Sequence, residues 1–148
     1  VGQLWRGCVD PQTAVVRAQT CLVEDYCEFP QVPTDQPVVT APTYLSLQTP
    51  GHDNTGELFR AIARFEPDTA KLTVAEAGTE QYPSEPIYVP KGDPTKPAGW
   101  VLSVVYDGAA HQSEVWIYDS DRLEAEPVCR LALPSVIPHS FHGTWRPG

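Results

Sequence analysis

The sequence has no methionine and few basic residues, and each shortage limits what the chain can be. Without an initiator methionine, we expect the 148 residues to be a fragment of a longer protein. Ten Lys and Arg stand against 19 Asp and Glu, which gives a formal charge of −9 at pH 7. Proteins that bind nucleic acid neutralise its phosphates with a basic patch. The sequence shows no such patch, so we expect no nucleic-acid partner.

Long apolar runs are missing as well. No stretch approaches the roughly 20 apolar residues that cross a bilayer, although 41% of the residues are hydrophobic and 20% are charged, as in globular proteins. We therefore expect neither a transmembrane segment nor a secretory signal. Any peripheral contact with a membrane would come from regions outside this chain. This pattern predicts a cytoplasmic protein, or a plastid protein if the source is a plant.

Cysteine is scarce, and its spacing fits no zinc or redox motif. Cys8, Cys21, Cys27 and Cys129 contain no Cys-x-x-Cys pair, and a Cys/His zinc site would need paired ligands at short spacing. Four cysteines allow three patterns of two disulfides, but nothing indicates a secretory context. We expect reduced thiols that are buried as small apolar groups.

Proline and glycine are plentiful and divide the chain into short segments. Sixteen prolines and ten glycines separate segments rich in Val, Thr, Tyr, Trp and Leu, which is typical of strands joined by turns. Residues Glu57 to Phe65 could be read as a helix. A strand is favoured there because a turn follows at Asp68, and Lys71 to Ala75 then alternates as a returning strand.

An internal repeat organises these strands. Hairpin-like segments begin at Leu4, Leu58 and Val115, which lie 54 and 57 residues apart. After each hairpin comes a short segment with one conspicuous polar residue, which is Glu28, then Glu85, then His142. These three positions are separated by 85 − 28 = 57 and 142 − 85 = 57 residues. One further apolar strand precedes the next hairpin, so each unit has four strands.

Four antiparallel strands repeated about every 50 residues indicate the blades of a β-propeller. On this interpretation residues 1–20 are the outer strands of one blade, 26–76 and 83–133 are complete blades, and 137–145 form the innermost strand of a closing blade. The chain is then all-β, with about two and a half blades of four-stranded antiparallel sheet. A closed ring needs roughly four to eight blades, which again indicates a fragment.

The innermost strand of each blade lines the central channel, so Glu28, Glu85 and His142 should face a common axis. Imidazole is a ligand for iron, copper, nickel and zinc, and a ligating histidine usually donates its second ring N–H to a carboxylate or a carbonyl. The spacing is thus compatible with a metal centre backed by carboxylates. From spacing alone, the favoured alternative is that these glutamates accept hydrogen bonds from backbone amides around a water-filled channel.

Five segments resemble, in order and approximate spacing, the C-terminal third of the carotenoid cleavage oxygenases, the retinal pigment epithelial membrane protein-like family. These segments are Tyr-Cys-Glu-Phe-Pro at 26–30, Ser-Glu-Pro-Ile-Tyr-Val-Pro at 84–90, Gly-Trp-Val-Leu-Ser-Val-Val-Tyr-Asp at 99–107, Ser-Glu-Val-Trp-Ile-Tyr-Asp at 113–119 and Ile-Pro-His-Ser-Phe-His-Gly-Thr-Trp at 137–145. The closing Phe-His-Gly-Thr-Trp is the most specific of them. Residues 37–55 resemble nothing in particular.

The resemblance implies a seven-bladed propeller that holds a non-haem Fe(II) on its axis through four histidines. His142 corresponds to the last of these ligands, and the other three would lie upstream. Glu28 and Glu85 correspond to glutamates that hydrogen-bond the ligating histidines, with Glu85 the partner of His142. The implied reaction is cleavage of a conjugated double bond by O₂ into two carbonyl products. The implied substrate is an apolar polyene, namely a carotenoid, an apocarotenoid or a stilbene. The isolated chain is expected to be inactive.

The other histidines and the acidic clusters are expected to lie outside the site. His52 and His111 fall in turn-like sequence and should be exposed. His139 lies three residues from His142, so strand alternation should point it to the opposite face. Phe141 and Trp145 are expected to pack between blades. The solvated acidic residues should be Glu24, Asp25, Glu124 and Glu126.

Two other classes of function remain open from the residues alone. A propeller glycosidase would use Glu28 and Glu85 as paired carboxylates, whose separation sets the stereochemistry. A non-catalytic propeller would instead bind a partner protein through one face. A histidine at the third register position, His142, disfavours the glycosidase.

Overall fold

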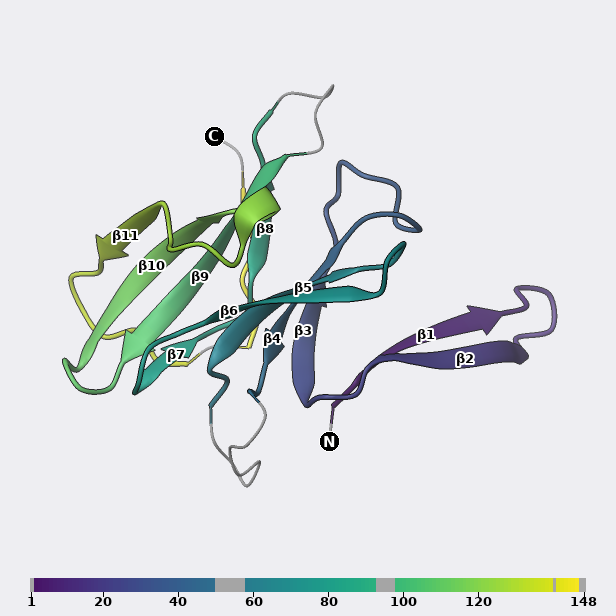
Figure 1. Ribbon diagram of the computed structural model, residues 1–148, viewed down its shortest axis with the longest axis horizontal. Coiled ribbons are helices and arrows are strands. Elements are labelled where there is room, and N and C mark those ends of the chain that lie inside the picture. Colours follow the sequence, from purple (N-terminus) through teal and green to yellow (C-terminus); the bar gives the residue numbers. More distant parts are fainter. Residues whose placement is uncertain (1, 50–57, 93–97, 140, 147–148) are drawn as a thin grey trace.

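The chain is built from antiparallel β-strands (Figure 1). The computed structural model describes residues 2–49, 58–92, 98–139 and 141–146. The strands form three sheets: β1 (Leu4–Val9) with β2 (Val16–Val23); β3 (Cys27–Gln31), β4 (Thr43–Leu47), β5 (Ala61–Glu66) and β6 (Lys71–Glu76); and β7 (Gln81–Pro83), β8 (Ile87–Pro90), β9 (Gly99–Asp107), β10 (Gln112–Asp119) and β11 (Cys129–Ala132). The only helix in the described ranges is a short 3₁₀ turn, η1 (Ser120–Arg122), so none there could cross a membrane.

The predicted all-β fold class is confirmed. The segment that could have been a helix, Glu57 to Phe65, forms strand β5 from Ala61, with Glu57 itself outside the described residues. β5 pairs with β6 through a tight turn, so that Phe65 faces Leu72 and Glu66 faces Lys71. From Ala61 to Phe65 the apolar side chains alternate between packed clusters on the two faces of the sheet, and this burial outweighs their weak helical periodicity.

The second and third sheets share one plan, in which consecutive strands lie side by side. The order in the second sheet is β3-β4-β5-β6. In the third sheet β7 and β8 pair with the same strand, β9, and together act as a single interrupted strand, followed by β10 and β11. Each sheet is therefore a four-stranded antiparallel meander of the kind that forms propeller blades. Its first strand lies at one edge.

The second sheet is buried on both faces, because its residues alternate between two clusters. Along β4 and β5, Tyr44 and Ile62 pack with Val101, Trp116 and other buried residues of the third sheet. The residues between them face the other way, where Leu45, Leu47, Ala61, Ala63 and Phe65 pack with Val23 of the hairpin β1–β2. The sheets are thus stacked face to face, and the stacking fixes where their edge strands lie.

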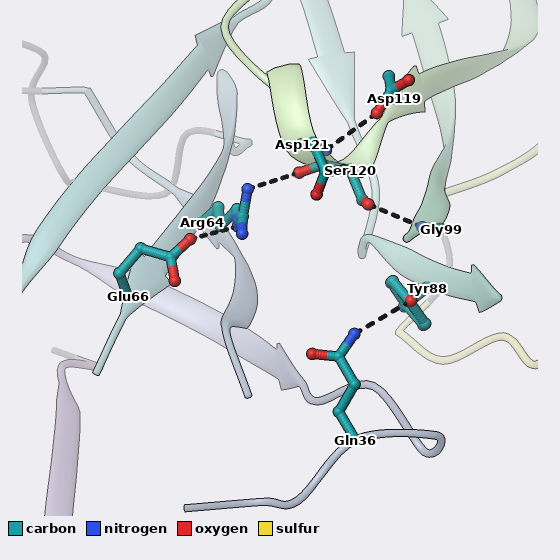
Figure 2. A network of polar contacts seen from close by, with 8 residues as sticks. All are labelled: Gln36, Arg64, Glu66, Tyr88, Gly99, Asp119, Ser120 and Asp121. Carbon is teal, nitrogen blue, oxygen red and sulfur yellow. Dashed lines mark hydrogen bonds and ion pairs between the residues drawn. The ribbon is translucent and has the colours of Figure 1, made fainter. Parts of the chain in front are cut away.

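A polar network joins the second sheet to the third (Figure 2). The guanidinium of Arg64 on β5 donates a hydrogen bond of 2.9 Å to the carbonyl of Ser120 and forms an ion pair of 2.6 Å with Glu66. The hydroxyl of Ser120 accepts from the amide of Gly99 at 2.9 Å, where β9 begins. Arg64 therefore ties the centre of one sheet to the beginning of the central strand of the next.

Residues 137–139 and 141–146 form no strand, in contrast to the innermost strand expected from 137 to 145. The amide of Ile137 donates to the hydroxyl of Ser113 at 3.0 Å, but beyond it no described strand lies alongside to pair with. A β-strand needs such a partner, and in a closing blade the partner would come from another part of the protein. Phe141 and Trp145, expected between blades, are 75% and 50% exposed for the same reason.

The cysteines are all free, but only Cys27 is buried. Cys8 is exposed, and Cys21 and Cys129 are partly exposed, so the prediction of uniformly buried thiols is wrong. Cys8 lies in the β1–β2 hairpin, which extends beyond the second sheet (Figure 1). No sheet among the described residues covers that part of the hairpin, and its apolar residues Trp5, Val9, Val15 and Val16 are exposed.

Replacing Arg64 with methionine should lower the free energy of unfolding by about 1 to 3 kcal/mol, because hydrogen bonds to a charged group between packed sheets are lost. Urea denaturation of the variant measures this. Arg17→Met is the matched control: Arg17 also forms an ion pair of 2.6 Å, with Asp10, but its side chain is 60% exposed against 20% for Arg64. The control should lose less than about 1 kcal/mol. Equal losses would show that Arg64 does not join the sheets.

Candidate metal centre

The edge strand of the second sheet is broken immediately after Glu28. Glu28 still pairs with Ser46 of β4, but the register shifts between Glu28 and Gln31. Phe29, between them, has a φ of 56°, in the left-handed region that a bulky side chain rarely adopts. Pro30 follows and has no N–H to donate to the ladder. The strand therefore bends at the point where the carboxylate of Glu28 projects.

The edge of the third sheet is broken at the corresponding place. Glu85 lies between β7 and β8, 57 residues after Glu28, and Pro86 follows it. Ser84 keeps the edge attached: its amide donates to the carbonyl of Val104 at 2.8 Å, and its carbonyl accepts from the hydroxyl of Ser103 at 2.9 Å. The repeat seen in the sequence thus corresponds to an interruption of each edge strand, immediately after Glu28 in the second sheet and at Glu85 in the third.

Glu85 is buried, with only 4% of its side chain exposed, and both of its oxygens have partners. Oε2 lies 3.2 Å from Nδ1 of His142. Oε1 accepts a hydrogen bond from the amide of Gly143. One carboxylate therefore binds two successive residues of a segment that has no strand partner, and this fixes the position of His142 at the edge of the sheet.

The imidazole of His142 is itself 77% exposed. When Nδ1 carries the proton and donates it to Glu85, Nε2 keeps its lone pair. This is the arrangement found in metal-ligating histidines, whose second nitrogen donates to a carboxylate. His142 thus presents one free ligand atom, held in orientation by a buried group.

Glu28 has a different partner. Its Oε1 accepts a hydrogen bond of 2.8 Å from the hydroxyl of Tyr26, and this bond raises the pKa of Tyr26 above its ordinary value. Among the residues that the structure describes, Glu28 is linked to His142 through its neighbour Phe29, whose ring meets the imidazole edge to face at 5.6 Å between centroids. The structure thus places all three predicted residues in one region, but only Glu85 bonds to His142.

A small cavity of about 150 Å³ lies between the two interrupted edges. Most of its lining is apolar, from Phe29, Leu58, Phe59, Pro83 and Phe141, and its ionisable groups are Glu28 and His139. Phe29 also contacts Phe59 and Phe141, at centroid distances of 5.9 and 6.4 Å. The surroundings of the predicted site are therefore aromatic rather than hydrophilic.

The other histidines have different surroundings. His111 is exposed in a turn, as predicted, and lies 2.9 Å from the hydroxyl of Tyr106. His139 meets the rings of Tyr82 and Tyr106 edge to face, and desolvation lowers its pKa. His52 falls outside the described residues. Within the described ranges no three His, Cys, Asp or Glu side chains come together as metal ligands.

The acidic residues predicted to be solvated, Glu24, Asp25, Glu124 and Glu126, are exposed as expected. Sequence reasoning missed three residues that shape the site, namely Tyr26, Phe29 and Gly143. For Tyr26 a signal was available, because residues two apart on an extended chain share a face. Nothing in the sequence marks the left-handed backbone of Phe29.

Known proteins similar to this chain include the carotenoid and related cleavage oxygenases. A family model described as retinal pigment epithelial membrane protein matches residues 1–147. The chain is 33% identical over 146 residues to apocarotenoid-15,15'-oxygenase from Synechocystis sp., an alignment that covers 97% of this chain and 29% of that relative. It is 31% identical over 93 residues to resveratrol cleavage oxygenase 1 from Aspergillus fumigatus, covering 62% of this chain and 18% of the relative.

Solved structures of the Synechocystis apocarotenoid oxygenase are also similar. Its cobalt-substituted form matches with a TM-score of 0.82 and 31% identity, over 98% of this chain and 30% of that one. A chimera that includes part of the same enzyme gives a TM-score of 0.84 at 28% identity, over 97% and 30%. The chain therefore spans about three tenths of the length of these relatives.

Gly143→Ala should separate His142 from Glu85, because the added Cβ would lie 3.0 Å from Cδ1 of Ile87 and 3.5 Å from Oε1 of Glu85. We expect the distance between Nδ1 of His142 and Oε2 of Glu85 to increase from 3.2 Å to beyond about 3.5 Å, outside hydrogen-bonding range. A crystal structure of the variant measures this. Adding Ile87→Val removes the obstructing methyl group and should restore the contact. An unchanged distance in Gly143→Ala alone would show that close packing at Gly143 does not hold His142 against Glu85.

Proposed function

Because the chain belongs to the retinal pigment epithelial membrane protein family, we propose that it supplies part of a non-haem Fe(II) dioxygenase. The enzyme would cleave a conjugated double bond of a carotenoid or apocarotenoid with O₂. Among its relatives are proteins named as apocarotenoid, carotenoid and resveratrol cleavage oxygenases. The full propeller would contain seven blades, with the blades absent from this chain contributed by the rest of the protein.

One observation supports this proposal most strongly: the buried carboxylate of Glu85 holds Nδ1 of His142. Imidazole is a suitable ligand for iron, and the carboxylate behind it fixes the tautomer and the direction of the ring. His142 would hold Fe(II) through Nε2, and the donor set present in the chain fits that metal. When bound, Fe(II) would supply the redox chemistry that lets O₂ react with the double bond.

The residues of this chain would orient the ligand and exclude water. Glu85 keeps the proton of His142 on Nδ1, so Nε2 remains free. The second oxygen of Glu85 accepts from the amide of Gly143, and this bond holds the segment that carries His142 in place. Phe29 presents an aromatic ring to the imidazole and also contacts the ring of Phe141. One O₂ consumed for each C=C bond gives two C=O bonds, so the reaction balances with no further reductant.

The apolar cavity next to the site supports a hydrophobic substrate. Its lining of Phe29, Leu58, Phe59 and Phe141 suits a conjugated hydrocarbon better than a sugar or a phosphate ester. The glycosidase alternative fits less well, because both oxygens of Glu85 are occupied by His142 and Gly143. Glu85 is also only 4% exposed, so it is poorly placed to protonate or attack a glycosidic bond, as one of the paired carboxylates would have to.

The chain alone would not form the whole centre. It contributes one imidazole in the required position, and a single imidazole binds Fe(II) weakly. The other ligands and most of the substrate path would come from the rest of the protein. We therefore expect the isolated 148 residues to bind no stoichiometric iron and to show no turnover.

In the full-length protein, His142→Ala should lose most of its iron and essentially all turnover, because a metal bond is deleted. Glu85→Gln keeps the shape and one acceptor but removes the charge, so it should lose about 10-fold to 100-fold in metal affinity or activity. Iron content and the initial rate of apocarotenoid loss are measured together. His111→Ala, which replaces an exposed turn histidine, is the matched control and should behave as the parent protein. Full iron and full rate in His142→Ala would contradict the proposal.

A further inference from the structure

Glu28 and Glu85 occupy equivalent positions in the repeat, but different donors hold them. Both oxygens of Glu85 are engaged by the segment that carries His142. Glu28 uses one oxygen, Oε1, to accept from the hydroxyl of Tyr26 at 2.8 Å. Within the described residues, Oε2 of Glu28 has no hydrogen-bond donor. One half of this carboxylate is therefore fixed, and the other half is available.

Tyr26 is itself firmly placed. Its ring stacks on Phe59 with centroids 5.4 Å apart and an interplanar angle of 29°. Its carbonyl accepts a hydrogen bond of 2.9 Å from the amide of Gln48 at the end of β4. Gly2 lies near the ring as well, since a Cβ there would lie 3.4 Å from it, at ordinary van der Waals distance. The stacking contact and the backbone hydrogen bond thus favour one position of the ring and of its hydroxyl.

The backbone beyond Glu28 is irregular. After Glu28 the chain turns through the left-handed conformation of Phe29, and regular pairing with β4 stops until Gln31. A glutamate side chain has several rotatable bonds, and ordering it costs conformational entropy. Glu85 is ordered by two groups of the C-terminal segment. Glu28 lacks both of these groups and has Tyr26 in their place, two residues earlier on the same face of the extended chain.

We propose that Tyr26 is a positioning residue for the iron centre. Its hydroxyl holds Oε1 of Glu28, so that Oε2 stays directed at an iron-ligating histidine from another part of the protein. This inference rests on the proposed function. Tyr26 touches neither iron nor substrate, and it acts through Glu28 alone. Without its hydroxyl, the carboxylate would sample several rotamers and support the ligand only part of the time.

The test is Fe(II) binding by the metal-depleted full-length protein, titrated without oxygen. Tyr26→Phe keeps the ring that stacks on Phe59 and removes only the hydroxyl. We expect Fe(II) to bind about 10-fold more weakly, which corresponds to the loss of one hydrogen bond to a charged group, with the melting temperature nearly unchanged. Tyr106→Phe is the matched control, since its hydroxyl contacts His111 in an exposed turn. This control should bind Fe(II) like the parent protein.

A second measurement separates positioning from a general structural role. In a Glu28→Ala background, adding Tyr26→Phe should cause no further loss of Fe(II) affinity, because the residue through which Tyr26 acts is gone. The same tenfold loss in that background would overturn the inference, and so would parental affinity in Tyr26→Phe alone. A Tyr26→Phe protein that fails to fold would also contradict it, since the retained ring predicts normal folding.

Failure of the proposed function gives a different result. In that case His142→Ala would bind Fe(II) as tightly as the parent protein, whatever Tyr26→Phe does. If His142→Ala abolishes binding while Tyr26→Phe leaves it unchanged, the metal centre stands and only the role of Tyr26 is wrong.

Discussion

The arrangement of the candidate site depends on the hydrogen bonds that the buried carboxylate of Glu85 forms with His142 and Gly143. The segment that follows β11 has no strand partner within the described residues, so no ladder holds it in place. Glu85 replaces that ladder with two bonds from one side chain. A buried carboxylate is costly unless it is paired, and here the pairing also orients an imidazole. Stability and ligand geometry therefore come from the same contact.

The stacked sheets supply the rigidity that this contact needs. β4 and β5 are buried on both faces, against the hairpin β1–β2 on one side and the third sheet on the other. Arg64 adds a polar link between the second and third sheets. Because the sheets cannot shift independently, their interrupted edges stay close together, and Glu28, Phe29 and Glu85 remain within reach of one C-terminal segment. The candidate site lies where the edge strands of both sheets are interrupted.

Much of this could be predicted from the sequence. Residue alternation and turn residues indicated the strands, and the 57-residue spacing gave equivalent positions to Glu28, Glu85 and His142. Pairing of Glu85 with His142 came from family resemblance, and the structure places the two in contact. The left-handed backbone of Phe29 leaves no trace in the sequence. Residues 137–139 and 141–145 form no strand and Cys8 is exposed; both depend on which strands lie alongside, which local patterns do not record.

The most direct test of the central claim is X-ray diffraction at the iron absorption edge from crystals of the iron-loaded full-length protein. Anomalous scattering locates the metal independently of any assumption about its ligands. The account predicts one strong iron peak at bonding distance from Nε2 of His142, with Nδ1 of the same ring still bonded to Glu85. An iron peak that lies away from His142, or one bonded to Nδ1 in place of Glu85, would contradict it.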